Sequence, residues 1–226
     1  MAEPEIGEAG RDDAAATEER TLPALGVLVS GRGSNLRAIL DAIARGELRA
    51  RVGIVISSRA GVPALEIAAA RDIPTRVIAP RDYPSRAEEG AAIVAALSEA
   101  GVALVVLAGF ARIFDPCVVR AFPHRILNIH PSLLPAFPGL DAQRQALEYG
   151  VCVSGCTVHF VDEELDHGVI VLQKTVPVLA GDDEHTLAAR ILVQEHVAYA
   201  EAIGRVISGK YQFAGRRYLT AQTETE

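Results

Sequence analysis

Short apolar runs that alternate with helical patterns constrain the fold of this chain most strongly. Five runs predict strands, at 25–30, 52–57, 75–78, 104–108 and 126–130. Their apolar character on both faces is typical of a parallel sheet that is covered by helices. Helical patterns fill gaps between them, at 35–45, 63–71 and 85–100. The alternation predicts right-handed βαβ units, and therefore an α/β fold with a doubly wound, mostly parallel sheet and helices on both faces.

The remaining segments predict how the chain is organised into domains. Two further strands are expected at 153–161 and 169–176, joined by an acidic loop, and a long helix at 184–207. Residues 1–21 are rich in Glu, Asp, Ala and Gly and have almost no large apolar side chains, so we expect a disordered acidic extension. We expect a single domain over 22–219, followed by a polar tail at 220–226.

Charge and composition exclude several classes of function. The chain has 22 basic and 29 acidic residues, a net charge of −7, which argues against a nucleic-acid partner. Its apolar runs are far shorter than the roughly 20 residues of a membrane span, and no signal-peptide pattern opens the sequence, so we expect a cytoplasmic protein. Three cysteines without a Cys-x-x-Cys pair predict neither a disulfide framework nor a metal site.

A glycine-rich loop, Ser30-Gly31-Arg32-Gly33-Ser34-Asn35, follows the first predicted strand and opens a predicted helix. Backbone N–H groups at a helix start bind anions, and glycines let a phosphate approach closely. Leu36 stands where a dinucleotide-binding loop has its third glycine, and the Gly-Lys-Ser/Thr of a Walker loop is absent. The loop therefore predicts either a monophosphate site or, alternatively, a tight turn with Ser34 or Asn35 as helix cap.

Asn128 and His130 lie at the end of the fifth predicted strand, two residues apart, so they project from the same face. An amide beside an imidazole suits acyl transfer, because the amide can stabilise an oxyanion and the imidazole can move protons. The alternative is a core histidine at a strand end. Asp166, in the acidic loop 162–168, is the candidate carboxylate partner, and it is expected to raise the pKa of His130. Leu165 is expected to anchor this loop.

Four segments together resemble the phosphoribosylglycinamide formyltransferase family. They are Ser-Gly-x-Gly-Ser-Asn at 30–35, Leu-Ala-Gly-Phe-x-Arg-Ile at 107–113, Leu-Asn-Ile-His-Pro-Ser-Leu-Leu-Pro at 127–135 and Gly-Cys-Thr-Val-His-Phe-Val at 155–161. The resemblance implies a Rossmann-like formyltransferase fold. It also implies formyl transfer from 10-formyltetrahydrofolate, as co-substrate, to the glycine amine of 5′-phosphoribosylglycinamide in de novo purine biosynthesis, without a metal.

The resemblance also assigns roles to individual residues. The catalytic residues would be Asn128, His130 and Asp166. The residues that bind the phosphoribosylglycinamide would be Gly33, Ser34, Asn35, Leu192, Val193, Gln194 and Glu195. The residues that bind the folate would be Arg86, Ala111, Arg112, Ile113, Phe114, Asn128, Asp162, Glu163, Glu164, Leu165 and Asp166. His159 matches a further family position near the site.

Competing interpretations remain at this point. A 10-formyltetrahydrofolate hydrolase would carry an N-terminal regulatory domain, and methionyl-tRNA formyltransferase a C-terminal RNA-binding domain, neither of which this sequence predicts. A serine hydrolase with Ser132 would lack its Gly-x-Ser-x-Gly motif. A non-catalytic module that binds a nucleotide phosphate would leave Asn128 and His130 without a role. The sequence leaves open whether the chain forms a homodimer.

One departure from the family pattern concerns the acidic loop. Where the family has Asp-x-Gly-Pro, this chain reads Asp166-His167-Gly168-Val169. Without the proline the loop is expected to be less ordered, and folate affinity is expected to suffer more than the type of reaction.

Overall fold

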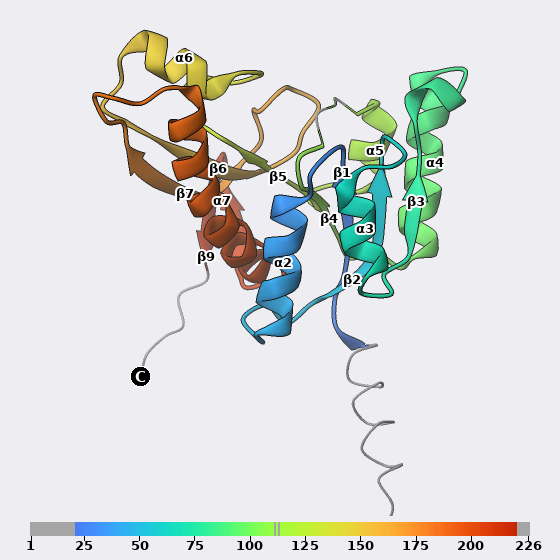
Figure 1. The fold of residues 1–226 in the computed structure, drawn as a ribbon. Coiled ribbons are helices and arrows are strands. Elements are labelled where there is room, and N and C mark those ends of the chain that lie inside the picture. The colour runs from blue at the N-terminus through green and yellow to red at the C-terminus, as the bar shows by residue number, and fades with distance from the viewer. Residues whose placement is uncertain (1–20, 111, 113, 221–226) are drawn as a thin grey trace, which may run out of the picture.

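A nine-stranded sheet with helices on both faces forms the body of the molecule (Figure 1). The structure, a computed structural model, describes residues 21–110, 112 and 114–220. The expected extension at 1–21 and the tail at 220–226 therefore fall, apart from Thr21 and Thr220, outside the described residues. No helix in the described part is long and apolar enough to cross a membrane.

The first five strands form the parallel half of the sheet, in the order β3-β2-β1-β4-β5. Their bounds are β1 (Ala24–Val29), β2 (Arg51–Ser57), β3 (Thr75–Val77), β4 (Leu104–Leu107) and β5 (Ile126–His130). All five agree with the predicted strands to within a residue. The order reverses beside β1, which places the loops after β1 and β4 on either side of a crevice where ligands of such sheets usually bind.

Four more strands extend the sheet beyond β5. β6 (Val153–Phe160) pairs antiparallel with β5 and with β7 (Ile170–Pro177), so the sheet is mixed. A C-terminal hairpin of β8 (Tyr211–Ala214) and β9 (Arg217–Thr220) joins the edge through one parallel contact between Ile170 and Arg217. The hairpin was not predicted, because each of its strands has four residues, of which only two are partly buried.

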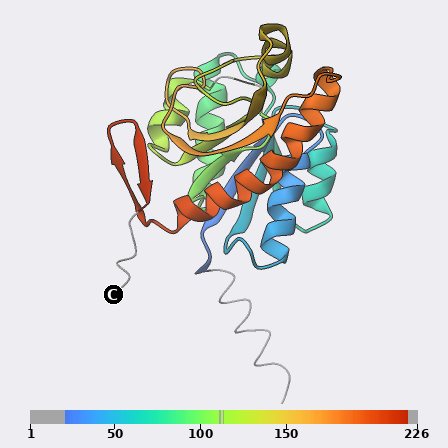
Figure 2. The same cartoon turned by 90° about the vertical axis from the view of Figure 1, so that its left-hand side faces the viewer.

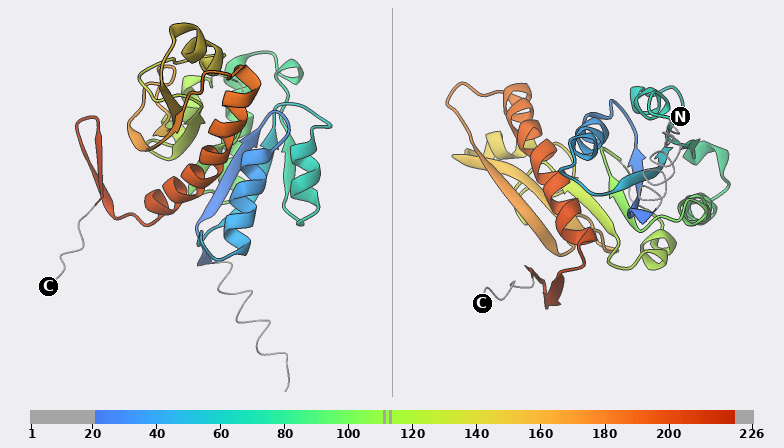
Figure 3. Two further views of the ribbon diagram at one scale, coloured as in Figure 1. Left: turned by 60° about the vertical axis from the view of Figure 1, so that its left-hand side comes forward. Right: turned by 90° about the horizontal axis from the view of Figure 1, so that it is seen from below.

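Helices cover the sheet in two layers, which the view from below separates clearly (Figure 3). The apolar core on one face includes residues of α2 (Ser34–Ala44), α3 (Pro63–Ala69), α6 (Ala142–Tyr149) and α7 (Glu184–Ile207). The core on the other face includes residues of α4 (Arg86–Glu99) and α5 (Pro116–Ala121), and a short 3₁₀ turn (Pro80–Asp82) precedes α4. This arrangement is the predicted doubly wound α/β fold.

Helix α7 supports the strand ends that carry the candidate site. It packs on β5, β6, β7 and α2, and runs diagonally along the body in Figure 2. The buried hydroxyl of Tyr199 is shared as a donor between two backbone carbonyl oxygens, that of Leu107 at 2.9 Å and that of Leu127 at 3.0 Å. Asp183 and Thr186 form a capping box at the start of the helix. A helix so fixed holds the ends of β4 and β5 together.

Candidate active site

The alternation of side chains along β5 places Asn128 and His130 on one face of the sheet. Leu127 and Ile129 point the other way, into the core that α7 covers. Asn128 pairs across the antiparallel ladder with His159 of β6, whose imidazole is on the same face. The sequence spacing therefore predicts the common face of Asn128 and His130, whereas the approach of His159 depends on the register between two strands.

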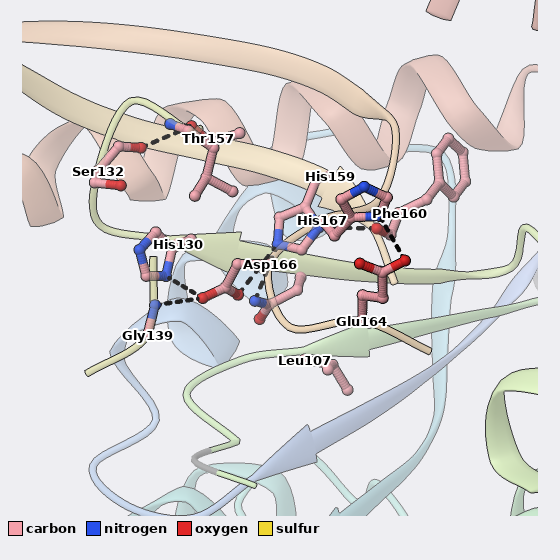
Figure 4. Close-up of polar contacts among 12 residues, drawn as sticks. Leu107, His130, Ser132, Gly139, Thr157, His159, Phe160, Glu164, Asp166 and His167 are labelled. Carbon is pink, nitrogen blue, oxygen red and sulfur yellow. Dashed lines mark hydrogen bonds and ion pairs between the residues drawn. The ribbon is translucent and has the colours of Figure 1, made fainter. Parts of the chain in front are cut away.

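Asp166 joins these side chains from the loop between β6 and β7 (Figure 4). Its Oδ2 lies 3.4 Å from His130 Nδ1, and its Oδ1 lies 3.7 Å from His159 Nε2. The backbone N–H of Gly139 donates to Oδ2 at 2.8 Å. Asp166 itself has a φ of 49°, in the left-handed region, which an Asp tolerates better than most residues. The structure thus brings the three predicted catalytic side chains together and adds His159 to them.

The second ring nitrogen of His130 faces a backbone acceptor. His130 Nε2 lies 2.9 Å from the carbonyl oxygen of Phe137, in the segment that follows β5. Since Nδ1 faces Asp166, both ring nitrogens of His130 face acceptors. A protonated imidazole would donate to both at once, whereas a neutral ring can donate to only one of them.

Burial decides the protonation of His130 in the resting protein. The side chain is only 6% exposed, and this burial lowers the pKa of His130; the Phe137 carbonyl and the Asp166 carboxylate offset part of the effect. Asp166 raises the pKa of His130, as expected, but loss of hydration outweighs the attraction of one carboxylate, so the pKa lies below its ordinary value. The sequence did not reveal how completely the segment after β5 covers the ring.

Asp166 is held in its charged form. Burial by itself would raise the pKa of Asp166, but hydrogen bonds from His159 and Gly139, with the charge interactions of His130 and His159, lower it below its ordinary value. The resting cluster is therefore a carboxylate between two imidazoles.

His159 is oriented by its neighbours. Its Nδ1 lies 2.8 Å from the carbonyl oxygen of Phe160, and its Nε2 lies 3.3 Å from Asn128 Nδ2. Nε2 therefore faces both the Asn128 amide and Asp166 Oδ1: without a proton it accepts from Asn128, and with a proton it donates to Asp166.

The glycine loop and α7 form a second polar site. Asn35 Nδ2 donates to Glu195 Oε2 at 2.9 Å, although 160 residues separate them. Burial raises the pKa of Glu195, and the bond from Asn35 lowers it only in part. Asn35 Oδ1 is buried and has no protein partner among the described residues. Ser34 and Leu192 line a cavity of about 810 Å³ between α2 and α7, which Asn35 and Glu195 do not line.

The start of α2 has no side-chain cap among the described residues, so the expectation of Ser34 or Asn35 as cap is wrong. Gly33 occupies the cap position with a φ of 76°. A Cβ atom there would lie 2.8 Å from Ala64 Cβ, so both the conformation and the space require glycine. The first-turn amides of α2 remain directed toward the loop, as an anion site requires.

The residues predicted to bind folate occupy several settings. Arg86 donates to the carbonyl oxygen of Phe114 at 2.9 Å, and Arg112 forms an ion pair with buried Glu89 at 3.0 Å. Together with the apolar ring of Phe114, the two arginines line one small cavity. Ala111 and Ile113 lie outside the described residues.

Side chains of the acidic loop are mostly engaged with protein partners. Glu163 pairs with Arg120 at 2.9 Å, and Asp162 Oδ1 accepts from the backbone of Glu164 at 3.0 Å. Leu165 is 57% exposed. The expectation that Leu165 anchors the loop is therefore wrong, and polar contacts hold the loop instead.

Not every predicted contact of the phosphoribosyl site is directed inward. Val193 is 61% exposed, whereas Glu195 is buried and Gln194 half-buried.

Among the described residues no group of three or more His, Cys, Asp or Glu side chains is placed to hold a metal ion.

Comparison with known proteins places this geometry in a family. Residues 25–203 match the formyl transferase family. Phosphoribosylglycinamide formyltransferase of Escherichia coli (strain K12) is 42% identical over 184 residues, which cover 81% of this chain and 87% of that protein. The "Trifunctional purine biosynthetic protein adenosine-3" of Drosophila pseudoobscura pseudoobscura is 50% identical over 186 residues. Those residues are 81% of this chain but only 14% of that longer protein.

A solved structure supports the same assignment. Glycinamide ribonucleotide transformylase 1 from Symbiobacterium toebii superposes with a TM-score of 0.87 at 50% sequence identity, and the match covers 89% of this chain and 95% of the other. Sequence and fold thus agree. The chain belongs to the formyl transferase family, and its similar relatives include phosphoribosylglycinamide formyltransferases.

Proposed function

We propose that this chain transfers the formyl group of 10-formyltetrahydrofolate to the glycine amine of 5′-phosphoribosylglycinamide, a step of de novo purine biosynthesis. The observation that carries the proposal is the convergence of Asn128, His130 and Asp166 on one face of β5, with Asp166 Oδ2 3.4 Å from His130 Nδ1. The identity to phosphoribosylglycinamide formyltransferases along most of their length supports the choice of substrates.

The reaction needs stabilisation of charge and movement of one proton. The amine nitrogen attacks the formyl carbon, and the electrons of the C=O bond move to oxygen to give a tetrahedral oxyanion. Asn128 donates a hydrogen bond to that oxygen. His130, neutral in the resting protein, accepts the proton that the attacking nitrogen releases. It returns the proton to N10 of the folate as the C–N10 bond breaks and the C=O bond reforms.

The surroundings of His130 suit this exchange. An added proton gives the ring a donor for Asp166 and a donor for the Phe137 carbonyl or for the substrate that replaces it. The carboxylate of Asp166 stabilises the imidazolium once it forms, without holding the proton in the resting state. Asp166 is thus assigned to orient and stabilise His130.

Two neighbouring sites would hold the substrates. Gly33, Ser34 and Asn35 would bind the phosphate through the start of α2, with Glu195 near the ribose and glycinamide end. Arg86, Arg112, Phe114 and the loop Asp162 to Asp166 would bind the folate. Since the side chains of His130 and Asp166 are only 6% and 8% exposed, we infer that substrate entry displaces the Phe137 segment.

Release of tetrahydrofolate, followed spectrophotometrically with and without 5′-phosphoribosylglycinamide, tests the proposal. We expect release that depends on the amine, and much weaker use of the same acceptor without its phosphate. Release that ignores the amine would show a hydrolase. Binding of phosphate esters without any formyl transfer would show a non-catalytic module.

A further inference from the structure

His167, two residues before the Val169 that departs from the family pattern, is tied to a distant part of the chain. Its Nε2 lies 2.7 Å from Nη1 of Arg216, which stands in the turn of the β8–β9 hairpin. Nη2 of the same guanidinium donates to the carbonyl oxygen of His167. On its other side, His167 Nδ1 lies 2.9 Å from Asp162 Oδ2, at the start of the loop. One side chain thus links the hairpin to both ends of a short loop.

Three contacts connect Arg216, His167 and Asp162. Nη1 of Arg216 lies close to both ring nitrogens of His167, 2.7 Å from Nε2 and 3.3 Å from Nδ1, and Nη2 donates to the backbone carbonyl oxygen of His167. Nδ1 of His167 lies 2.9 Å from Asp162 Oδ2. The restraint therefore runs from Arg216 through the backbone and ring of His167 to Asp162.

Aromatic contacts connect the base of the hairpin, whose turn carries Arg216, to the end of β6. Phe160, at the end of β6, lies 5.4 Å from Phe213 and 6.3 Å from Tyr218, measured between ring centroids. Tyr211 stacks on Tyr218 at 4.8 Å. Aromatic pairs at these distances contribute beyond the area that they bury.

The backbone around Asp166 depends on contacts at its two ends. Leu165 points to solvent, and Asp166 is in a left-handed conformation that the surrounding contacts must maintain. The backbone bond from Gly139 fixes the carboxylate from one direction. His167 is the next residue along the chain, so its restraint acts directly on the backbone that carries Asp166.

We propose that Arg216 is a positioning residue that, through His167, keeps the acidic loop in the conformation in which Asp166 faces His130. The proposal rests on the proposed function in that this loop would also contact the folate. Loss of Arg216 is then expected to weaken folate binding and leave binding of the phosphoribosyl substrate unchanged. In this proposal the contacts of Arg216 offset the loss of order that is expected from the missing proline at Val169.

The first test follows hydrogen exchange of the ligand-free protein, which does not depend on activity. Arg216→Ala should speed exchange of the amides at 162–168 by about fivefold, near the upper range for a partly exposed polar pair. Arg217→Ala is the matched control, since this neighbouring arginine pairs with Ile170 through its backbone. Equal exchange in the wild type and Arg216→Ala proteins, or equal effects of both substitutions, would overturn the proposal.

The second test uses kinetics and a double substitution. Arg216→Ala should raise KM for 10-formyltetrahydrofolate by about fivefold and leave KM for 5′-phosphoribosylglycinamide within about twofold. His167→Ala removes the ring contacts but keeps the bond from Arg216 to the backbone carbonyl oxygen, so its effect should be smaller, and the double variant should add nothing to Arg216→Ala. Additive effects, or equal changes in both KM values, would contradict the tie. A wild-type protein without formyl transfer would refute the proposed function, and the exchange measurement would still decide the role of Arg216.

Discussion

At the scale of single residues, the site depends on the balance between burial and charge at His130. The structure shows a ring that loses hydration next to a carboxylate, and burial outweighs the carboxylate. The sequence predicts which side chains share a face, because alternation along a strand is local. It could not predict the protonation of His130, because that depends on the segment that folds over the ring.

The pH dependence of kcat/KM checks this balance. Since burial lowers the pKa of His130 and the mechanism uses the neutral ring, activity should fall on acidification with a midpoint below about 6.5, the ordinary value for histidine. Asp166→Asn should move that midpoint lower still, because the carboxylate raises the pKa of His130. An acid limb above 6.5, or activity that rises on acidification, would contradict the mechanism.

The same shift has a consequence for stability. The unfolded chain binds a proton at His130 at a higher pH than the folded chain does. The contribution of His130 to the free energy of unfolding is therefore fully present above about pH 6.5, and it is lost as the pH falls through the lowered pKa of the folded protein.

Gly168 offers a steric test at the same scale. A Cβ atom there would lie 1.7 Å from the carbonyl oxygen of Phe160, so Gly168→Ala must displace backbone. We expect a loss of about 1–3 kcal/mol of unfolding free energy or more, measured in urea, and reduced turnover. Gly181→Ala is the control, since no described atom lies within 4 Å of its Cβ position. Equal stability of the two variants would show that the loop is not packed as described.

At the scale of elements, sequence prediction succeeded best where apolar side chains are buried. β1, β4 and most of β2 and β5 are buried, and α7 has a long continuous pattern, so their bounds agree closely with prediction. The bounds of β3 also agree, although its three residues are exposed. The β8–β9 hairpin and the short helices α5 and α6 were not predicted. A helix of only one or two turns, or a short strand that is partly exposed, shows little periodicity in its apolar residues. The approach of His159 to Asn128 required the β5–β6 register, which the spacing of residues does not specify.

Tyr199 tests the support that α7 gives to β4 and β5. Tyr199→Phe keeps the ring and removes the donor to the Leu107 and Leu127 carbonyl oxygens, which are buried. We expect a loss of about 1–3 kcal/mol in the free energy of unfolding, as for a buried polar group that loses its partner. Tyr149→Phe, at a side chain that is 80% exposed, should change it by less than about 0.5 kcal/mol. Similar small values for both would show that the Tyr199 hydroxyl contributes no support.

At the scale of the whole molecule, the candidate site lies where the sheet changes from parallel to antiparallel. β5 supplies Asn128 and His130, β6 supplies His159, and the connection that returns the chain to β7 supplies Asp166. The glycine loop lies on the same molecule at the start of α2, next to α7. The chain thus carries a predicted phosphate site and a predicted proton-transfer cluster, the two sites that the proposed transfer of a one-carbon group between two bound substrates requires.

The role of His130 in proton transfer is tested most simply with the His130→Ala protein. The measurement is transfer of a ¹⁴C-labelled formyl group from 10-formyltetrahydrofolate to 5′-phosphoribosylglycinamide. The turnover of this variant should fall by about 10²-fold or more, the usual contribution of a general acid–base group, while the thermal midpoint stays near that of the wild type. His185→Ala, at an exposed histidine in the first turn of α7, should transfer the label at the wild-type rate. Near-normal transfer by a folded His130→Ala protein would contradict the account.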